Sequence, residues 1–181
     1  MAKINKLILK VVLLLVLAVS TSEAQTLKQD AIYKDIRYPE RVVQLANKLE
    51  TLKEKQHLEY KNREQLLFIL NHIDKRATKD FTLKKLTAIA IKESSLNPNA
   101  VNKRDGTVGL FQVKTSWRKN FPWYKNPRDP FQSTQAAVNI LTYNKIHFKC
   151  NSNKAIKLYN GTDKRKTQAY LAKVNAIYKD I

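Results

Sequence analysis

The sequence predicts an α+β fold dominated by helices, and three observations support this. Only three glycines and five prolines occur in 181 residues, so few positions interrupt regular structure. Apolar residues recur at helical spacing in several separate segments. Turn-forming residues gather in two stretches, 97–108 and 117–128, and we expect any small sheet in the first of them.

The first residues have the pattern of a secretory signal. Lysines precede an apolar run at 11–19, and Ser22 and Ala24 place small residues where a signal peptidase reads. The run is shorter than the roughly 20 apolar residues that a spanning helix needs. We expect residues 1–24 to be a cleaved signal peptide, which leaves no stable membrane span on an exported protein of the periplasm or cell envelope. A retained signal is the main alternative.

Charge and cysteine content exclude several kinds of protein. The formal net charge is +19, which attracts polyanions, and export removes most of the case for nucleic acid as the partner. We therefore expect anionic envelope polymers to bind, more weakly at high salt. Cys150 is the one cysteine, so no internal disulfide can form. His57, His72 and His147 are scattered without metal-ligand spacing, so neither a metal nor a cofactor is expected.

A helical pattern is expected after Pro39 and continues to Ile73. Charges of both signs accompany its apolar residues, which indicates a solvated outer face rather than a purely basic membrane-binding face. The apolar positions with helical spacing are Val42, Leu45, Ala46, Leu49 and Leu52, then Leu66, Leu67, Leu70 and Ile73. We assign residues 25–65 to a helical extension that precedes the main domain.

The next predicted helix carries the residue of greatest interest, Glu93. Asp80 or Thr82 is expected to cap its start. Glu93 follows the apolar stripe of Leu83, Leu86 and Ala90, so its carboxylate should point inward. Burial disfavours the ionised form and raises the pKa of a carboxyl group, which suits a general acid. Taken alone, the residue is more readily explained as a cap or an ion pair at a helix end.

Three further helices complete the prediction. Asp129-Pro130 resembles an N-cap followed by proline at the first helical position. A short helix should end at Asn160-Gly161, where glycine can adopt a left-handed cap. The last helix places Tyr170, Val174 and Ile177 on one stripe.

An ordered set of short motifs follows Glu93. It consists of Glu93-Ser94, Asn97-Pro98, Gly109-Leu110-Phe111-Gln112-Val113, Tyr159-Asn160-Gly161 and Tyr170-Leu171-Ala172-Lys173-Val174. In order and spacing this set resembles the lytic transglycosylase domain of the soluble type, a relative of goose-type lysozyme. The resemblance implies a lysozyme-like domain over residues 66–181 that acts on peptidoglycan glycan strands.

The resemblance also implies roles for individual residues. Glu93 would protonate the glycosidic oxygen between N-acetylmuramic acid and N-acetylglucosamine and then act as base, which gives a 1,6-anhydro product. Substrate-binding roles fall to the residues that match the family's cleft, namely Ser94, Gly109, Gln112, Tyr159, Asn160 and Tyr170.

Several alternatives stay open from the sequence. A true hydrolase would need a second carboxylate, and Asp105 is the acid between Glu93 and Gln112, although its place beside Gly106 is typical of a turn. A non-catalytic cationic wall-binding protein is the alternative from another class. The aromatic residues at Trp117, Phe121, Trp123 and Tyr124 fit sugar stacking and core packing equally. The biological setting, whether envelope assembly or a phage role, is not specified.

Overall fold

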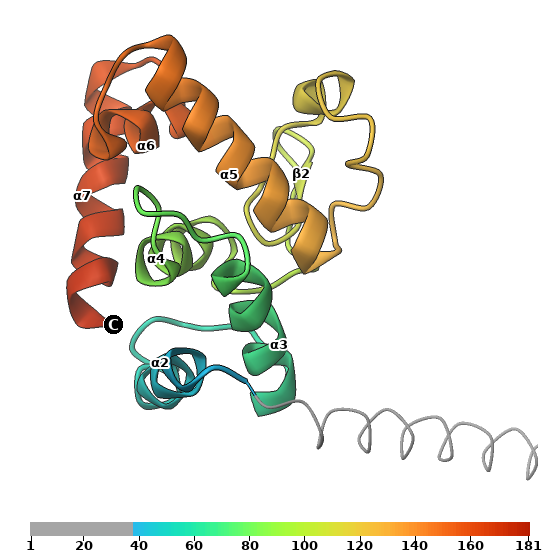
Figure 1. Cartoon of the computed structure of the whole chain (residues 1–181), viewed down its shortest axis with the longest axis vertical. Coiled ribbons are helices and arrows are strands. Elements are labelled where there is room, and N and C mark those ends of the chain that lie inside the picture. The colour runs from blue at the N-terminus through green and yellow to red at the C-terminus, as the bar shows by residue number, and fades with distance from the viewer. Residues whose placement is uncertain (1–37) are drawn as a thin grey trace, which may run out of the picture. The chain divides into compact units, whose positions relative to one another are not determined.

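The computed structural model describes residues 38–181, and the predicted signal peptide at 1–24 lies outside them. Within the described residues the chain forms six α-helices and one two-stranded antiparallel sheet (Figure 1), so the helix-dominated α+β prediction is confirmed. In chain order the elements are α2 (Glu40–Thr51), α3 (Arg63–Asp74), α4 (Leu83–Ser94), β1 (Val101–Asn102), β2 (Thr107–Val108), the 3₁₀ helix η1 (Thr115–Lys119), α5 (Pro130–His147), α6 (Ser152–Asn160) and α7 (Lys164–Asp180).

The helices begin where polar side chains can cap them. Thr82, one of the two predicted caps, accepts a hydrogen bond from the Lys85 N–H at 3.3 Å. Asp129 accepts from the Phe131 N–H at 3.0 Å, and Pro130 occupies the first turn of α5 as predicted. These bonds satisfy N–H groups that have no partner within their own helix.

Two helix ends redirect the chain beside the predicted site. Ser95 and Leu96 both have positive φ angles, 55° and 64°, so the chain turns away sharply after Glu93. Gly161 ends α6 as predicted, but its φ of 143° and ψ of −159° are not the left-handed helical values that we expected. The reason is that Asn160-Gly161 leads directly into the Asp163 cap of α7, so the backbone extends rather than coils.

Helix α4 occupies the centre of the core. It packs against α7 and α3, and α5 packs against α3 and α6, an arrangement visible in Figure 1. Four consecutive or nearly consecutive apolar side chains of α4 are fully buried, so it is covered on several sides, as a central helix must be. These are Leu86, Ala88, Ile89 and Ala90.

Helix α2, which precedes the motifs that begin at Glu93, contributes side chains to the same core. In α2, the side chains of Val42, Ala46 and Leu49 are fully buried, and α2 packs against α3. Residues 38–181 therefore form one compact unit. The boundary that we placed between residues 65 and 66 stays a prediction.

The small sheet lies within the segment expected to hold it. Val101 pairs with Val108 and Asn102 with Thr107, and a further bridge joins Val108 to Val113. The hairpin is thereby tied to the residues that carry Gln112. None of the helices in the described part of the chain has the length and apolar character needed to cross a bilayer.

Candidate active site

A cleft of about 540 Å³ opens between the end of α4, the β1–β2 hairpin, α5 and the junction of α6 with α7. Its lining is mostly polar. Glu93 and Asp105 are its acidic groups, and the basic groups around it are Lys92, Arg104, Lys114 and Lys166.

Glu93 occupies the penultimate position of α4 and is half-buried, with its carboxyl group in the lining of the cleft. Burial raises its pKa from 4.5 to about 7. A hydrogen bond from the Tyr170 hydroxyl and the charge of Lys92 oppose that rise, and the charge of Asp105 adds to it. Near neutral pH the group therefore holds a proton in a substantial fraction of molecules and can donate it.

Two tyrosines lie near this carboxyl group, one bonded to it and one in the same cleft. Tyr170, from α7, is 5% exposed and donates its hydroxyl proton to Oε1 of Glu93. Tyr159, at the end of α6, lines the cleft and donates to the carbonyl of Phe111 at 2.7 Å. Burial raises the pKa of both phenols well above 10, and the charge of Glu93 adds to it, so both stay protonated donors.

Gln112 is held rigidly at the cleft. Its backbone has a positive φ of 48°, and its side-chain amide donates to the carbonyls of Gly109 at 2.8 Å and Ala100 at 3.2 Å. Its oxygen lies 2.8 Å from the Thr107 hydroxyl, whose single proton is shared between Gln112 and Asp105. These bonds fix the side chain in place, which prepares it to meet a ligand in one geometry.

Gly109 makes a close contact with another segment of backbone. With φ at 93°, a Cβ atom there would lie 1.8 Å from the carbonyl oxygen of Pro127. The absence of a side chain at Gly109 lets the turn pack closely against the backbone at Pro127. Gly109 does not itself line the cleft. Gly109 is a residue that shapes the turn carrying Gln112.

Ser94 is likewise placed under the cleft. Its side chain is buried, at 8% exposure, and its hydroxyl lies 2.7 Å from the carbonyl of Leu110 and 3.1 Å from that of Ala90. The bond to Leu110 ties the end of α4 to the turn that carries Gln112. Of the seven predicted site residues, Glu93, Gln112, Tyr159 and Asn160 line the cleft, whereas Ser94, Gly109 and Tyr170 support it.

Asp105 faces the cleft from the tip of the hairpin and is exposed to solvent. Desolvation is the largest single influence on its pKa and raises it. Hydrogen bonds from Thr107 and the charges of Arg104 and Lys114 together outweigh that influence and lower the pKa below its ordinary value. Asp105 is therefore ionised at neutral pH.

Other contributors to the cleft were not among the predicted site residues. Asn102, Thr107, Ile140, Leu158 and Lys166 line it. Asn102 and Thr107 pair with each other across the hairpin. The packing of α6 against α5 and α7 brings in the other three.

The aromatic residues divide between the two readings. Tyr124 is 2% exposed and belongs to the core, whereas Trp123 is 39% exposed. Trp117 does both, because it packs partly against the core and also lines the cleft.

The loop before α3 reaches the end of α4. The Glu59 N–H donates to the Ser95 carbonyl at 2.8 Å, and the Asn97 side-chain amide donates to the Glu59 carboxylate at 2.9 Å. These bonds clamp the left-handed turn that follows Glu93. Sequence reasoning missed this contact because it joins segments 38 residues apart.

A second hollow of about 600 Å³ lies among α2, α3 and α4. Its acidic side chain, Asp74, is already bonded to Arg41 at 2.7 and 2.8 Å, so we place the chemistry in the other cleft. In the described part of the chain no group of three or more His, Cys, Asp or Glu side chains is arranged to hold a metal ion.

Comparison with known proteins agrees with this geometry. The family model described as the transglycosylase SLT domain matches residues 71–180, which is more than half of the chain. No curated protein and no solved structure matches. SLT domains act on peptidoglycan, so the match supports peptidoglycan-cleaving transglycosylase-type activity outside the cytoplasm. The chain belongs to the transglycosylase SLT domain family.

Proposed function

We propose that this protein is a lytic transglycosylase that cleaves the β-1,4 bond between N-acetylmuramic acid and N-acetylglucosamine in peptidoglycan, with Glu93 as general acid and base. The observation that carries the proposal is the placement of Glu93, half-buried in a polar cleft with its pKa raised to about 7. A carboxyl group with that pKa can both donate and accept a proton near neutral pH.

The reaction follows from one carboxyl group. Protonated Glu93 gives its proton to the glycosidic oxygen, and the bond from that oxygen to C1 of the muramoyl sugar breaks with the electron pair leaving on oxygen. The carboxylate then removes the proton from the C6 hydroxyl of the same sugar, whose oxygen attacks C1. The products are a free 4-hydroxyl and a 1,6-anhydro end, Glu93 is protonated again, and no water is consumed.

The surrounding residues support both steps. The Tyr170 hydroxyl stabilises the Glu93 carboxylate once it has lost its proton. Asn160 offers a side-chain amide, and Gln112 and Tyr159, whose protons are already donated to backbone carbonyls, offer acceptor oxygens. We propose that these groups hold the sugars. Ser94 is a positioning residue, since its hydroxyl fixes the end of α4 to the Leu110 carbonyl.

Asp105 favours one alternative, a hydrolase. It is ionised in the same cleft and interacts electrostatically with Glu93, so it supplies the second carboxylate that inverting or retaining hydrolysis requires. Its hydrogen bonds to Thr107 tie it to the hairpin, which argues against a base that must reach a water molecule. The remaining alternative is a cationic wall-binding protein without activity.

Mass analysis of digested peptidoglycan separates these functions. Transglycosylation gives 1,6-anhydro ends, hydrolysis gives reducing ends, and a binding protein gives neither. Glu93→Gln should lower the cleavage rate by at least about 10²-fold while leaving sedimentation with peptidoglycan intact. Undiminished cleavage by that variant would remove Glu93 from the mechanism.

A further inference from the structure

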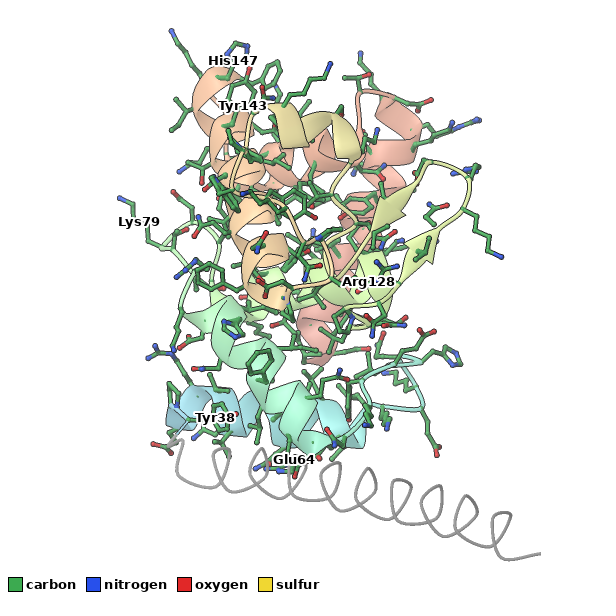
Figure 2. The ribbon with its side chains drawn as sticks, turned by 90° about the vertical axis from the view of Figure 1, so that its right-hand side faces the viewer. Tyr38, Glu64, Lys79, Arg128, Tyr143 and His147 are labelled. Atoms are coloured by element: carbon green, nitrogen blue, oxygen red, sulfur yellow. The ribbon has the colours of Figure 1, made fainter. Side chains whose placement is uncertain are left out.

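A row of exposed rings continues outward from the cleft. Tyr143 is 47% exposed, lies edge-on to Trp117 with ring centroids 5.8 Å apart, and stacks on His147 at 5.0 Å. His147 is exposed as well. We call Trp117, Tyr143 and His147 the aromatic strip; Figure 2 shows its last two members at the same end of the molecule.

The strip is joined to the cleft at two points. Trp117 lines the cleft and touches Tyr143. Ile140 also lines it, and Ile140, Tyr143 and His147 are spaced three and four residues apart, which places them on one face of α5. With a rise of 1.5 Å per residue, the strip extends about 10 Å along the helix beyond Ile140, a length that suits further sugar rings of a strand.

The chemistry of the strip fits a carbohydrate. Aromatic rings present flat apolar surfaces on which the C–H faces of sugars can pack, and their polar edges tolerate water. The single lysine of α5, Lys145, is ion-paired with Asp80 at 2.6 Å. The three rings themselves present apolar faces that match the C–H face of a sugar.

A lipid surface is the competing occupant. Ile146 and Phe148 are exposed, at 71% and 47%, and the Phe148 ring lies edge-on to His147 with centroids 4.9 Å apart. Exposed apolar groups can also insert into a membrane surface. The strip itself is continuous with the cleft, and a row of rings that begins inside a substrate cleft favours the substrate as its occupant.

We propose that the aromatic strip is an additional sugar-binding subsite, which extends the cleft along α5 and makes the protein favour long glycan strands over short fragments. The proposal rests on the proposed function for its substrate class. It adds Tyr143 and His147 as specificity-determining residues that contact the strand away from the bond that is cleaved.

The test compares substrates of two lengths. Tyr143→Ala, His147→Ala and the double variant are assayed for kcat/KM on polymeric glycan strands and on a tetrasaccharide as the short substrate. We expect a loss of about three- to tenfold on polymer for each single variant and no change on the tetrasaccharide. Tyr143→Phe keeps the ring and should retain the wild-type ratio. Phe131→Ala, which removes a 38% exposed ring from the first turn of the same helix, is the matched control.

Binding measurements keep this test separate from the catalytic proposal. In the Glu93→Gln background, the Tyr143→Ala and His147→Ala changes should weaken co-sedimentation with insoluble peptidoglycan, whether or not the wild-type protein cleaves it. Equal losses on both substrate lengths, or no loss on polymer, would overturn the subsite. So would unchanged glycan binding together with lost binding to vesicles of anionic phospholipid, which would assign the strip to a lipid surface.

Discussion

Two carboxyl groups line the same cleft from different elements, and their surroundings shift their pKa values in opposite directions. Glu93 comes from the last turn of α4, the central helix of the core, and is bonded to Tyr170. Asp105 comes from the exposed tip of the β1–β2 hairpin and is bonded to Thr107. Burial raises the pKa of Glu93 to about 7, while hydrogen bonds and nearby cations bring that of Asp105 below its ordinary value despite the opposing effect of desolvation.

The difference shows how secondary structure assigns chemical roles. A helix that ends at a cleft can carry a carboxyl group out of a packed core and leave it poorly solvated. A hairpin tip leaves its carboxyl group in water, where it stays ionised. In the proposed mechanism the end of α4, the helical wall of the cleft, provides the proton donor. The β1–β2 hairpin, the hairpin wall, provides a negative charge that raises the pKa of that donor.

The largest expected effect concerns the junction where the hairpin wall joins the rest of the fold. Gly109→Ala places a Cβ atom 1.8 Å from the Pro127 carbonyl oxygen at a φ of 93°, so the backbone must move. We expect a loss of about 3 kcal/mol or more in the free energy of unfolding, measured with urea. Gly106→Ala is the control, because nothing lies within 4 Å of its Cβ position and only the strain of its φ of 70° remains. Equal losses would show that the contact with Pro127 is unimportant.

The second effect is on stability at the helical wall. The pKa of Glu93 is higher in the folded protein, about 7, than the ordinary value of 4.5, so the fold loses stability as pH rises from about 4.5 to about 7. Glu93→Gln removes that loss. The variant should be about 2–3 kcal/mol more stable than wild type at pH 8 and equal to it at pH 4. Urea unfolding at both pH values checks this, and a gain that does not depend on pH would contradict it.

The third effect is on the pH profile. Tyr170→Phe removes the hydrogen bond that stabilises ionised Glu93, so the pKa of Glu93 should rise further. The alkaline limb of the cleavage rate should then move upward by on the order of one pH unit. Tyr178→Phe, on the same helix, is the control and should leave the limb in place. An unmoved limb in Tyr170→Phe would show that the hydroxyl does not act on Glu93.

The smallest expected effect is a shift of the alkaline limb in the direction opposite to that of Tyr170→Phe. Asp105→Asn removes a charge that raises the pKa of Glu93, so the alkaline limb should move downward by a few tenths of a pH unit. Cleavage should stay within about threefold of wild type, because a bystander charge contributes far less than a proton donor. A loss as large as that of Glu93→Gln would break the comparison and identify Asp105 as the second carboxylate of a hydrolase.

The sequence predicted the helical wall better than the hairpin wall. Helical spacing and caps are local, so the stripe ending at Glu93 and the caps at Thr82 and Asp129 were readable from the chain alone. The segment of the hairpin could be predicted from its turn residues, but the contacts that Asp105 and Thr107 make in the cleft could not.

The roles of the residues that support the cleft could be assigned only from the three-dimensional structure. Ser94 and Gly109 belong to the motifs, yet their placement under the cleft depends on the approach of Leu110 and Pro127. The clamp from Glu59 onto the turn after Glu93 joins distant segments, and no local pattern predicts such a contact. The exposure of Tyr143 depends likewise on which face of α5 the core leaves uncovered.

The most direct test of the central claim is the pKa of Glu93 itself. A carbon-detected NMR titration of side-chain carboxyl groups, assigned by comparison with Glu93→Gln, should show one glutamate with a pKa of about 7. A value near 4.5 would contradict the account, because a carboxyl group that is fully ionised at neutral pH could not serve as the proton donor.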